Sequence, residues 1–348
     1  MTVYIGVDFH ARQQTISYLT NETGEIQELV LLHNNRAAVR SFYEQFAGQR
    51  VIVGFESSGY AAWFEELLEE LGCEIWIGHA TYIRQFARRR QKNDRRDAEL
   101  ILDLLVTGDF PRIHRYSGRT REMLQQLRYR HRLVKIRTMV MNMLLFMASS
   151  RGETLRTQLQ SKRGQARLAA LSLPPALAQQ RDELLNLLQD LDQKIRGLER
   201  WLKQQTAEDA AVQRLQTHPG IGLLTSICVR YTLEEVQRFT TTRKVSAFAG
   251  FDPMEERSDE WRRMGAISKQ GSRWLRFYLV EAGQIAIRKD AALAQAYQRV
   301  RSRGGHAKAK VAIGRRLLVR AFIMLRDEID YAEFKRRGVA ARSARGSA

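Results

Sequence analysis

The sequence predicts a mixed α/β domain in the first third of the chain and a mainly helical remainder that includes long coiled-coil helices. Three observations support this fold class. Short β-branched runs alternate with helix-like stretches over the first 110 of the 348 residues. Leucines then recur every seven residues beyond a Pro-Pro pair. The charge balance also changes, from 11 Lys and Arg against 16 Asp and Glu in residues 1–110 to 46 against 22 in the rest.

Eight elements are expected in the α/β part. An Asn-Glu-Thr-Gly turn separates the second strand from the third, and Gly72 ends the second helix. The expected order is strand, strand, strand, helix, strand, helix, strand, helix, at residues 3–7, 14–20, 26–33, 36–46, 51–55, 61–71, 73–77 and 94–105. Three antiparallel strands that lead into β–α units make a mixed sheet flanked by helices, which is the ribonuclease H-like arrangement.

The rear part begins with a basic helix at residues 119–137. It leads to a Met-rich run at residues 139–147, whose methionines we interpret as core filling. Beyond the two prolines an a/d seam follows, formed by Leu177, Leu184, Leu188, Leu191, Ile195, Leu198 and Leu202. This spacing predicts a coiled coil. We expect the seam to pair two chains, and the alternative is that it packs on the helix at residues 120–150.

A tight turn, HPGIG at residues 218–222, precedes the next apolar helix. Gly220 and Gly222 would expose backbone N–H groups at the helix start, which is a ready phosphate site and resembles a helix-hairpin-helix element. A Gly-rich turn that only caps a helix is the alternative. The remaining expectations are helices at residues 245–250, 272–287 and 308–325, an irregular stretch at 251–271 and a disordered tail at 337–348.

Composition bounds the class of protein. The net charge of +19 and the pI near 10.3 favour a polyanionic partner, most directly nucleic acid. No stretch is apolar enough to predict a membrane span, and the first residues lack the basic and long apolar regions of a signal peptide. We therefore expect a cytoplasmic protein. Only Cys73 and Cys228 are present, which excludes a disulfide framework or a cysteine-based zinc site.

Four carboxylates fall at positions where a catalytic site would form. Asp8 and Glu56 end predicted strands, while Asp94 and Asp97 lie three apart at a predicted helix start. Carboxylates that converge at one sheet edge repel one another unless a hard cation lies between them, so we expect Mg²⁺, as two ions. Singly, each has a structural explanation, such as a helix cap for Asp94. We interpret His10 as a hydrogen-bonded neighbour of the site rather than as a ligand.

An ATPase of the actin and sugar-kinase type is disfavoured within the same fold. Its first hairpin needs Gly and a hydroxyl residue after the aspartate to hold phosphate. Here Phe9, His10 and Ala11 follow the aspartate.

Several motifs together carry a family resemblance: IGVDFH, FESSGY, KNDRRDAE, HPGIG, SAFAGFDP and ISKQGSRWLR, in this order. They are similar to those of the DEDD-type transposases of insertion-sequence family one-ten. The resemblance implies a RuvC-like domain at residues 1–111, a coiled-coil region at 112–208 and a serine-bearing transposase domain at 209–336. It assigns the four DEDD positions to Asp8, Glu56, Asp94 and Asp97.

The resemblance also implies a serine nucleophile. Ser258 is the serine nearest the expected place, and Ser268 and Ser272 are the alternatives, with Ser272 interpreted as a helix cap. Basic side chains around it are expected to hold nucleic-acid phosphates: Arg257, Arg262, Arg263, Lys269 and Arg273.

The resulting hypothesis is a prokaryotic, nucleoid-associated DNA recombinase. It would cut and rejoin target and donor DNA duplexes through a covalent phosphoserine, and the resemblance implies guidance by a structured noncoding (bridge) RNA. We expect a homodimer, or a tetramer on DNA. The alternatives are a Holliday-junction nuclease that uses water and a noncatalytic coiled-coil protein that binds nucleic acid.

Overall fold

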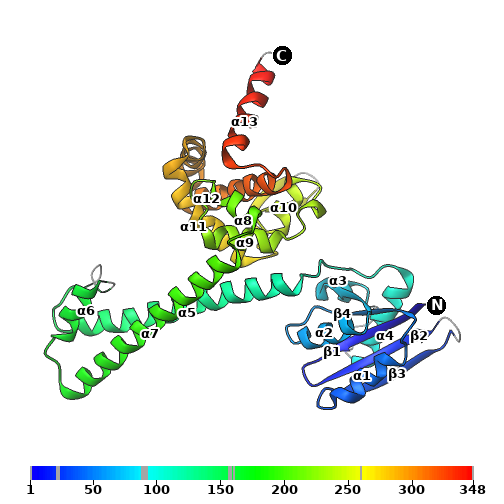
Figure 1. Ribbon diagram of the computed structural model, residues 1–348. Helices are drawn as coiled ribbons and strands as arrows, with labels where there is room; N and C mark the ends of the chain where they lie inside the picture. Colours follow the sequence, from blue (N-terminus) through cyan, green and yellow to red (C-terminus); the bar gives the residue numbers. More distant parts are fainter. Residues whose placement is uncertain are drawn as a thin grey trace. The chain divides into compact units, whose positions relative to one another are not determined.

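The computed structural model describes residues 2–20, 24–87, 93–155, 159, 161–258 and 261–346, with the backbone alone for residues 20, 255–258, 261–264 and 339–346. The chain divides into two units, Met1–Tyr116 and Ser117–Ala348 (Figure 1). Each unit has its own hydrophobic core.

A five-stranded sheet forms the first unit, in the order β3-β2-β1-β4-β5. Its strands are β1 (Thr2–Phe9), β2 (Gln13–Thr20), β3 (Ile26–Leu32), β4 (Arg50–Glu56) and β5 (Glu74–Gly78). The first three pair antiparallel, whereas β1 pairs parallel with β4 and β4 with β5. The predicted mixed sheet is confirmed.

Helices cover both faces of this sheet. They are α1 (Arg36–Glu44), α2 (Ala62–Glu70), α3 (Ala80–Gln85) and α4 (Asp94–Thr107). Successive strand residues point to opposite faces. Val3, Ile5 and Val7 are therefore buried with residues of α1 and α2, while α4 packs on the other face. The sequence predicted all of these helices except α3, which at six residues is too short to show a helical period.

Two paired glycines let α4 pack closely on the sheet. Gly6 of β1 lies beside Gly54 of β4 in the parallel register. A Cβ atom on Gly6 would lie 2.4 Å from the carbonyl oxygen of Ala98, and one on Gly54 would lie 2.8 Å from the side chain of Leu105. The absence of side chains at these two positions therefore fixes how near α4 lies to the strands.

Helices dominate the second unit. They are α5 (Gly118–Ser149), α6 (Lys162–Ala169), α7 (Pro175–Gln205), α8 (Ala210–Gln216), α9 (Leu223–Leu233), the 3₁₀ turn η1 (Val236–Arg238), α10 (Thr242–Phe248), α11 (Arg273–Lys289), α12 (Ala291–Arg326) and α13 (Tyr331–Gly346). The predicted mainly helical rear is confirmed. Among the helices that the structure describes, none is long and apolar enough to cross a membrane.

The heptad seam of α7 packs within the chain, against α5, and not against a second chain as we expected. Leu188, Leu191 and Ile195 are buried with residues of α5. Ion pairs join Arg130 to Glu199 and Arg137 to Asp192, so the two helices run antiparallel. The seam spacing is the same for both arrangements, which is why the sequence left them open.

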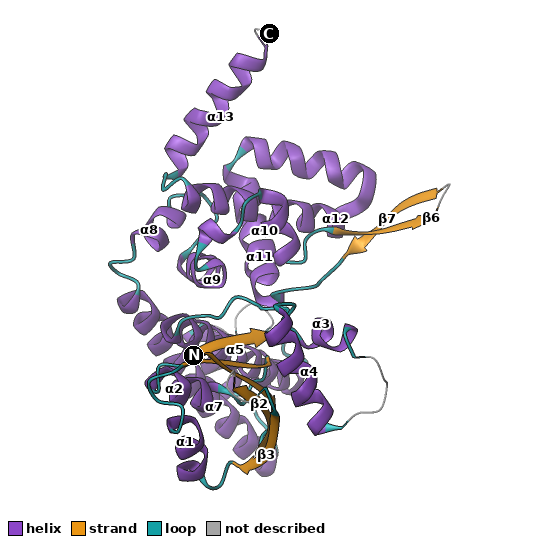
Figure 2. Ribbon diagram, turned by 90° about the vertical axis from the view of Figure 1, so that its right-hand side faces the viewer, coloured by secondary structure: helices purple, strands orange, loops and turns teal. Residues whose placement is uncertain are grey.

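A two-stranded hairpin replaces the irregular stretch expected at residues 251–271. It consists of β6 (Pro253–Ser258) and β7 (Trp261–Ile267), and it projects from the helices of its unit (Figure 2). Its sequence has no apolar alternation that would reveal a strand with a buried face. The expected disordered tail also differs, because α13 continues through Gly346, in a segment rich in the good helix formers Ala and Arg.

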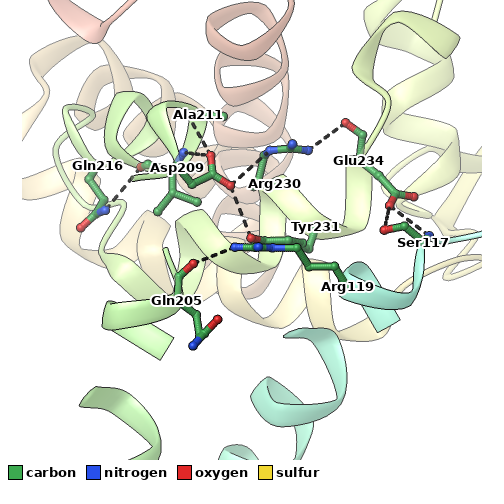
Figure 3. Close-up of polar contacts among 10 residues, drawn as sticks. Ser117, Arg119, Gln205, Asp209, Ala211, Gln216, Arg230, Tyr231 and Glu234 are labelled. Atoms are coloured by element: carbon green, nitrogen blue, oxygen red, sulfur yellow. Dashed lines mark hydrogen bonds and ion pairs between the residues drawn. The ribbon is translucent and has the colours of Figure 1, made fainter. Parts of the chain in front are cut away.

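Polar contacts join the ends of four helices in the second unit (Figure 3). The carboxylate of Glu234, after α9, accepts hydrogen bonds from the N–H and Oγ of Ser117 at 3.1 and 2.6 Å. Arg119 donates to the carbonyl of Gln205 at the end of α7, and Asp209 caps α8. These residues line a polar cavity of about 430 Å³. Their mutual hydrogen bonds favour a structural role.

Candidate active site

Strand alternation places Asp8 and Glu56 on the same face of the sheet. Gly6 and Gly54 lie against α4, and residues two positions further along each strand share that face. Asp8 and Glu56 stand there, near the carboxyl ends of two neighbouring parallel strands. The side chain of Asp8 is 15% exposed and that of Glu56 is 37% exposed. Both carboxylates therefore lie at the edge where α4 begins.

The first turn of α4 supplies the other two carboxylates. Asn93 caps the helix by accepting a hydrogen bond from the N–H of Arg95, which fixes where the helix starts. Asp94 and Asp97 follow in the first turn, where the helix dipole stabilises negative charge. The close packing at Gly6 brings this turn to the end of β1.

One cavity of about 300 Å³ collects these side chains. Asp8, Glu56 and Asp97 line it, together with His10 and Arg84. Asp94 joins the same group from the side, because ligand atoms of Asp8, His10 and Asp94 all lie within 4.8 Å of one another. The structure thus brings together all four carboxylates that the sequence analysis selected.

Arg84 was not among the residues predicted from the sequence. Its guanidinium lies 4.0 Å from the carboxylate of Glu56 and is 70% exposed. It belongs to the short helix α3, which has no sequence signal, so no pattern could have indicated it. His10 was recognisable from strand alternation, and its Nδ1 lies 3.5 Å from the carboxylate of Asp8.

The donor set of this cavity fits a hard divalent cation. Carboxylate oxygens are the ligands that Mg²⁺ prefers. Asp8, Glu56, Asp94 and Asp97 would hold the metal. A metal cation there would offset the mutual repulsion of the four carboxylates. Among the described residues that line the cavity, Arg84 is the one Lys or Arg that also reduces this repulsion.

Ser258 belongs to the second unit, where it ends β6 rather than lying in the polar loop that we expected. The hairpin register pairs it with Trp261 and pairs Arg257 with Arg262. The base of the hairpin is held by Ser268, whose Oγ donates to Asp252 at 2.8 Å. Ser272 caps α11 by accepting from the N–H of Leu275, as predicted. Both alternative serines thus have structural roles.

The predicted phosphate contacts lie in different settings. Arg257, Arg262 and Arg263 fall on the hairpin, where only the backbone is described, and Lys269 and Arg273 are exposed beyond it. In the HPGIG turn Gly220 has a φ of 95° and lies against α11, 2.7 Å from Ala286 N at its missing Cβ position. Gly222 is exposed where α9 begins. Gly220 therefore has a packing role, and phosphate binding by this turn stays a prediction.

Comparison with known proteins agrees with this arrangement. A DEDD-transposase model of the IS110 type, described as "Transposase", matches residues 5–147, which contain all four carboxylates. A second model, described as "Transposase IS116/IS110/IS902 family", matches residues 212–298, which contain the hairpin. The chain belongs to the IS110 family of DEDD transposases.

Individual relatives of this IS110 transposase carry similar names. A "Probable family 20 transposase" of Pseudomonas aeruginosa is 27% identical over 263 residues, covering 73% of this chain and 75% of the relative. The "Transposase for insertion sequence element IS1328" of Yersinia enterocolitica is 28% identical, covering 68% and 71%. The "Transposase for insertion sequence element IS1111A" of Coxiella burnetii is 27% identical, covering 58% of this chain and 56% of the relative. The chain is therefore a transposase, a DNA recombination enzyme, which excludes the noncatalytic alternative.

Proposed function

We propose that this IS110 transposase cuts and rejoins DNA at the cavity lined by Asp8, Glu56 and Asp97, with Asp94 beside it, and uses Ser258 as the nucleophile. The observation that carries the proposal is the convergence of four carboxylates, from two strands and one helix, on one face of a ribonuclease H-like sheet. Mg²⁺ bound there would supply Lewis-acid polarisation of the scissile phosphate.

The serine step balances as a transesterification. The Oγ of Ser258 attacks the phosphorus and loses its proton, while the phosphodiester P–O bond breaks and leaves a free hydroxyl on one DNA end. The hydroxyl of another DNA end then attacks the phosphoserine ester. This step restores the serine hydroxyl and joins the strands without loss of bond energy.

The charge distribution supports the partners of the reaction. The basic rear of the chain suits two DNA duplexes, donor and target, and a structured noncoding RNA whose base pairing selects them. Contacts to the phosphates of these strands would position them. The contacts would come from the HPGIG turn and from the side chains of Arg257, Arg262, Arg263, Lys269 and Arg273. We also propose domain boundaries at residues 111 and 208, and a place on the nucleoid in the cytoplasm of a prokaryote.

Assembly needs a surface other than the α7 seam, because that seam is buried against α5. The outer face of α5 offers one. Ile136, Met139, Met143 and Phe146 are 39%, 58%, 43% and 77% exposed, and they follow an a/d spacing of three and four. No charged residue lies between Arg137 and Arg151. We propose that two copies pair through this stripe, and that dimers combine into a tetramer on DNA.

A denaturing gel tests the serine mechanism. Incubated with Mg²⁺, RNA and cognate DNA, the wild-type protein is expected to leave a covalent protein–DNA adduct. Ser258→Ala should remove the adduct, while Ser268→Ala, a serine from the base of the same hairpin, should retain it. Free cleaved ends without any adduct would instead indicate a RuvC-like nuclease that uses water, and the serine role would be wrong.

A further inference from the structure

An aromatic group and a set of cations meet where α5 contacts α11. His131 of α5 lies edge-to-face against two rings of α11, with centroids 4.6 Å from Trp274 and 4.9 Å from Phe277. Phe277 remains 42% exposed, whereas Leu275, Tyr278 and Leu279 of the same helix are buried. We call His131, Trp274 and Phe277 the aromatic platform.

Cations lie on both helices that carry the aromatic platform. The guanidinium of Arg273 lies 4.9 Å from the ring of Trp274. Arg128, Arg132 and Lys135 are exposed on the turns of α5 that flank His131. Burial lowers the pKa of His131, and the positive charges of Lys135, Arg130 and Arg273 lower it further. The charges around the His131 imidazole are thus positive.

We infer that the aromatic platform binds unpaired nucleotides of a nucleic-acid strand, with one base stacked on Phe277 and the flanking phosphates on Arg273, Arg132 and Lys135. An exposed ring between cations presents the two features that a single strand recognises, a stacking surface and charge for its backbone. A base pair within a duplex has both faces covered by its neighbours, so a continuous duplex would first have to unstack before a base could reach the ring.

The positive charge of this surface favours a nucleic-acid strand over a second copy of the chain as its partner. Two identical platforms would bring the same excess of positive charge into contact, which costs free energy. A polyanion removes that cost and gains from releasing counterions. The cations therefore favour a nucleic-acid strand over self-association at this surface.

Binding of labelled oligonucleotides to the full-length protein tests the inference. The probes are a fluorescein-labelled 12-mer of uridine, a 12-mer of thymidine and a 12-base-pair DNA duplex, measured by anisotropy in EDTA so that no cleavage interferes. Phe277→Leu keeps the apolar bulk but removes the aromatic face. We expect it to weaken single-strand binding about tenfold and to leave duplex binding unchanged. Phe277→Trp should retain single-strand binding.

Two further variants complete the design. Ile285 is an apolar residue of α11 outside the platform with a similar exposure, 49%. Ile285→Ala is therefore the control and should change neither affinity. Arg273→Gln should weaken single-strand binding and reduce the slope of log affinity against log salt by about 0.7. A loss confined to the uridine probe identifies the occupant as RNA, and one confined to thymidine identifies DNA.

The inference is wrong if Phe277→Leu leaves single-strand binding unchanged or weakens duplex binding to the same extent. It rests on the action of the protein on nucleic acid and is independent of the serine step. If Phe277→Leu binds single strands normally while the wild-type protein forms the adduct on the denaturing gel, the platform is wrong and the proposed function stands. If Phe277→Leu loses single-strand binding while the wild-type protein forms no adduct, the platform stands and the serine mechanism is wrong.

Discussion

His218 is buried in the second unit in its neutral form. Its Nδ1 lies 2.9 Å from the carbonyl of Pro219, and its Nε2 lies 3.3 Å from the guanidinium of Arg320. A single tautomer satisfies both contacts, with a proton on Nδ1 that is donated and a lone pair on Nε2 that accepts. Arg320 in turn pairs with Asp290 at 2.8 Å, and Asp290 also accepts from Tyr331. Protonation of Nε2 would set two cations against each other.

Acid is therefore expected to destabilise the protein through His218. Burial lowers its pKa from 6.5 to about 4. The unfolded chain takes up the proton near pH 6.5 while the folded chain resists it, so this stability is complete above about pH 6.5 and is lost as the pH falls toward 4. The loss between pH 7 and pH 5 should be about 2 kcal/mol. Asp290, with a pKa of about 2, contributes only at lower pH.

Thermal melting at pH 7 and pH 5 measures this effect. His218→Gln removes the titrating group and keeps an acceptor for Arg320, so its melting temperature should fall less between the two pH values than that of the wild type. His33 and His131, whose pKa values burial also lowers, remain in both proteins as a common background. An equal fall in both proteins would show that another group is responsible.

The site residues differ in how far sequence could predict them. Asp8 and Glu56 are charged at strand positions that an apolar residue would normally fill, and Asp94 and Asp97 have helix-start spacing, so local patterns selected all four. Arg84 has no such signal, because its position depends on how α3 packs after β5. The role of Gly220 was also hidden, since the helix that it touches begins 53 residues further along the chain.

At the scale of elements, the position of α4 depends on Gly6. We expect Gly6→Ala to destabilise the first unit by about 3 kcal/mol, because the new methyl group would meet the backbone of α4, at 2.4 and 2.5 Å from Ala98 O and Leu102 N, rather than a side chain that can move. Gly59→Ala is the matched control, since a Cβ there meets no atom within 4 Å. Melting curves of both variants measure the difference. Equal stabilities would mean that α4 is not held by this contact.

The methionines of α5 show where element-level interpretation from sequence was only partly right. We interpreted the run at residues 139–147 as core filling. Met147 is buried and Met141 packs against the core, but Met139 and Met143 are exposed. Every position of this run is apolar except Asn142 and therefore gives no amphipathic period. Tertiary packing decides which face of α5 is covered by α7. The residues of this run alone do not indicate that face.

Charged replacements on the exposed stripe test the proposed dimer. Met139→Glu with Met143→Glu should reduce the mass seen by light scattering to that of a monomer, because two buried charges without partners oppose association. Thr138→Glu adds a charge to the same helix outside the stripe and should leave the mass unchanged. A dimer that persists in the double variant, or that Thr138→Glu also disrupts, would contradict pairing through this stripe.

At the scale of the whole molecule, the sequence predicted two kinds of architecture and their order, and the structure has both. Periodicity and turns were enough for the sheet, because β1, β2, β4 and β5 contain buried apolar residues and only β3 is at most half-buried. They were insufficient for the hairpin that carries Ser258, since a projecting ribbon buries little apolar surface. The proposed activity depends on the first unit supplying the carboxylate site.

The most direct test of that dependence compares DNA strand cleavage by two variants, Asp97→Asn and Asp103→Asn. Each variant removes one negative charge from α4. Asp97 lines the cavity with Asp8 and Glu56, whereas Asp103 is exposed and does not line it. Cleavage of cognate DNA with Mg²⁺ and RNA is measured together with Mn²⁺ binding by calorimetry and with RNA binding. We expect Asp97→Asn to lose cleavage and at least tenfold in metal affinity while RNA binding persists, and Asp103→Asn to behave as the wild type. Cleavage retained by Asp97→Asn, or equal losses in both variants, would contradict the carboxylate site.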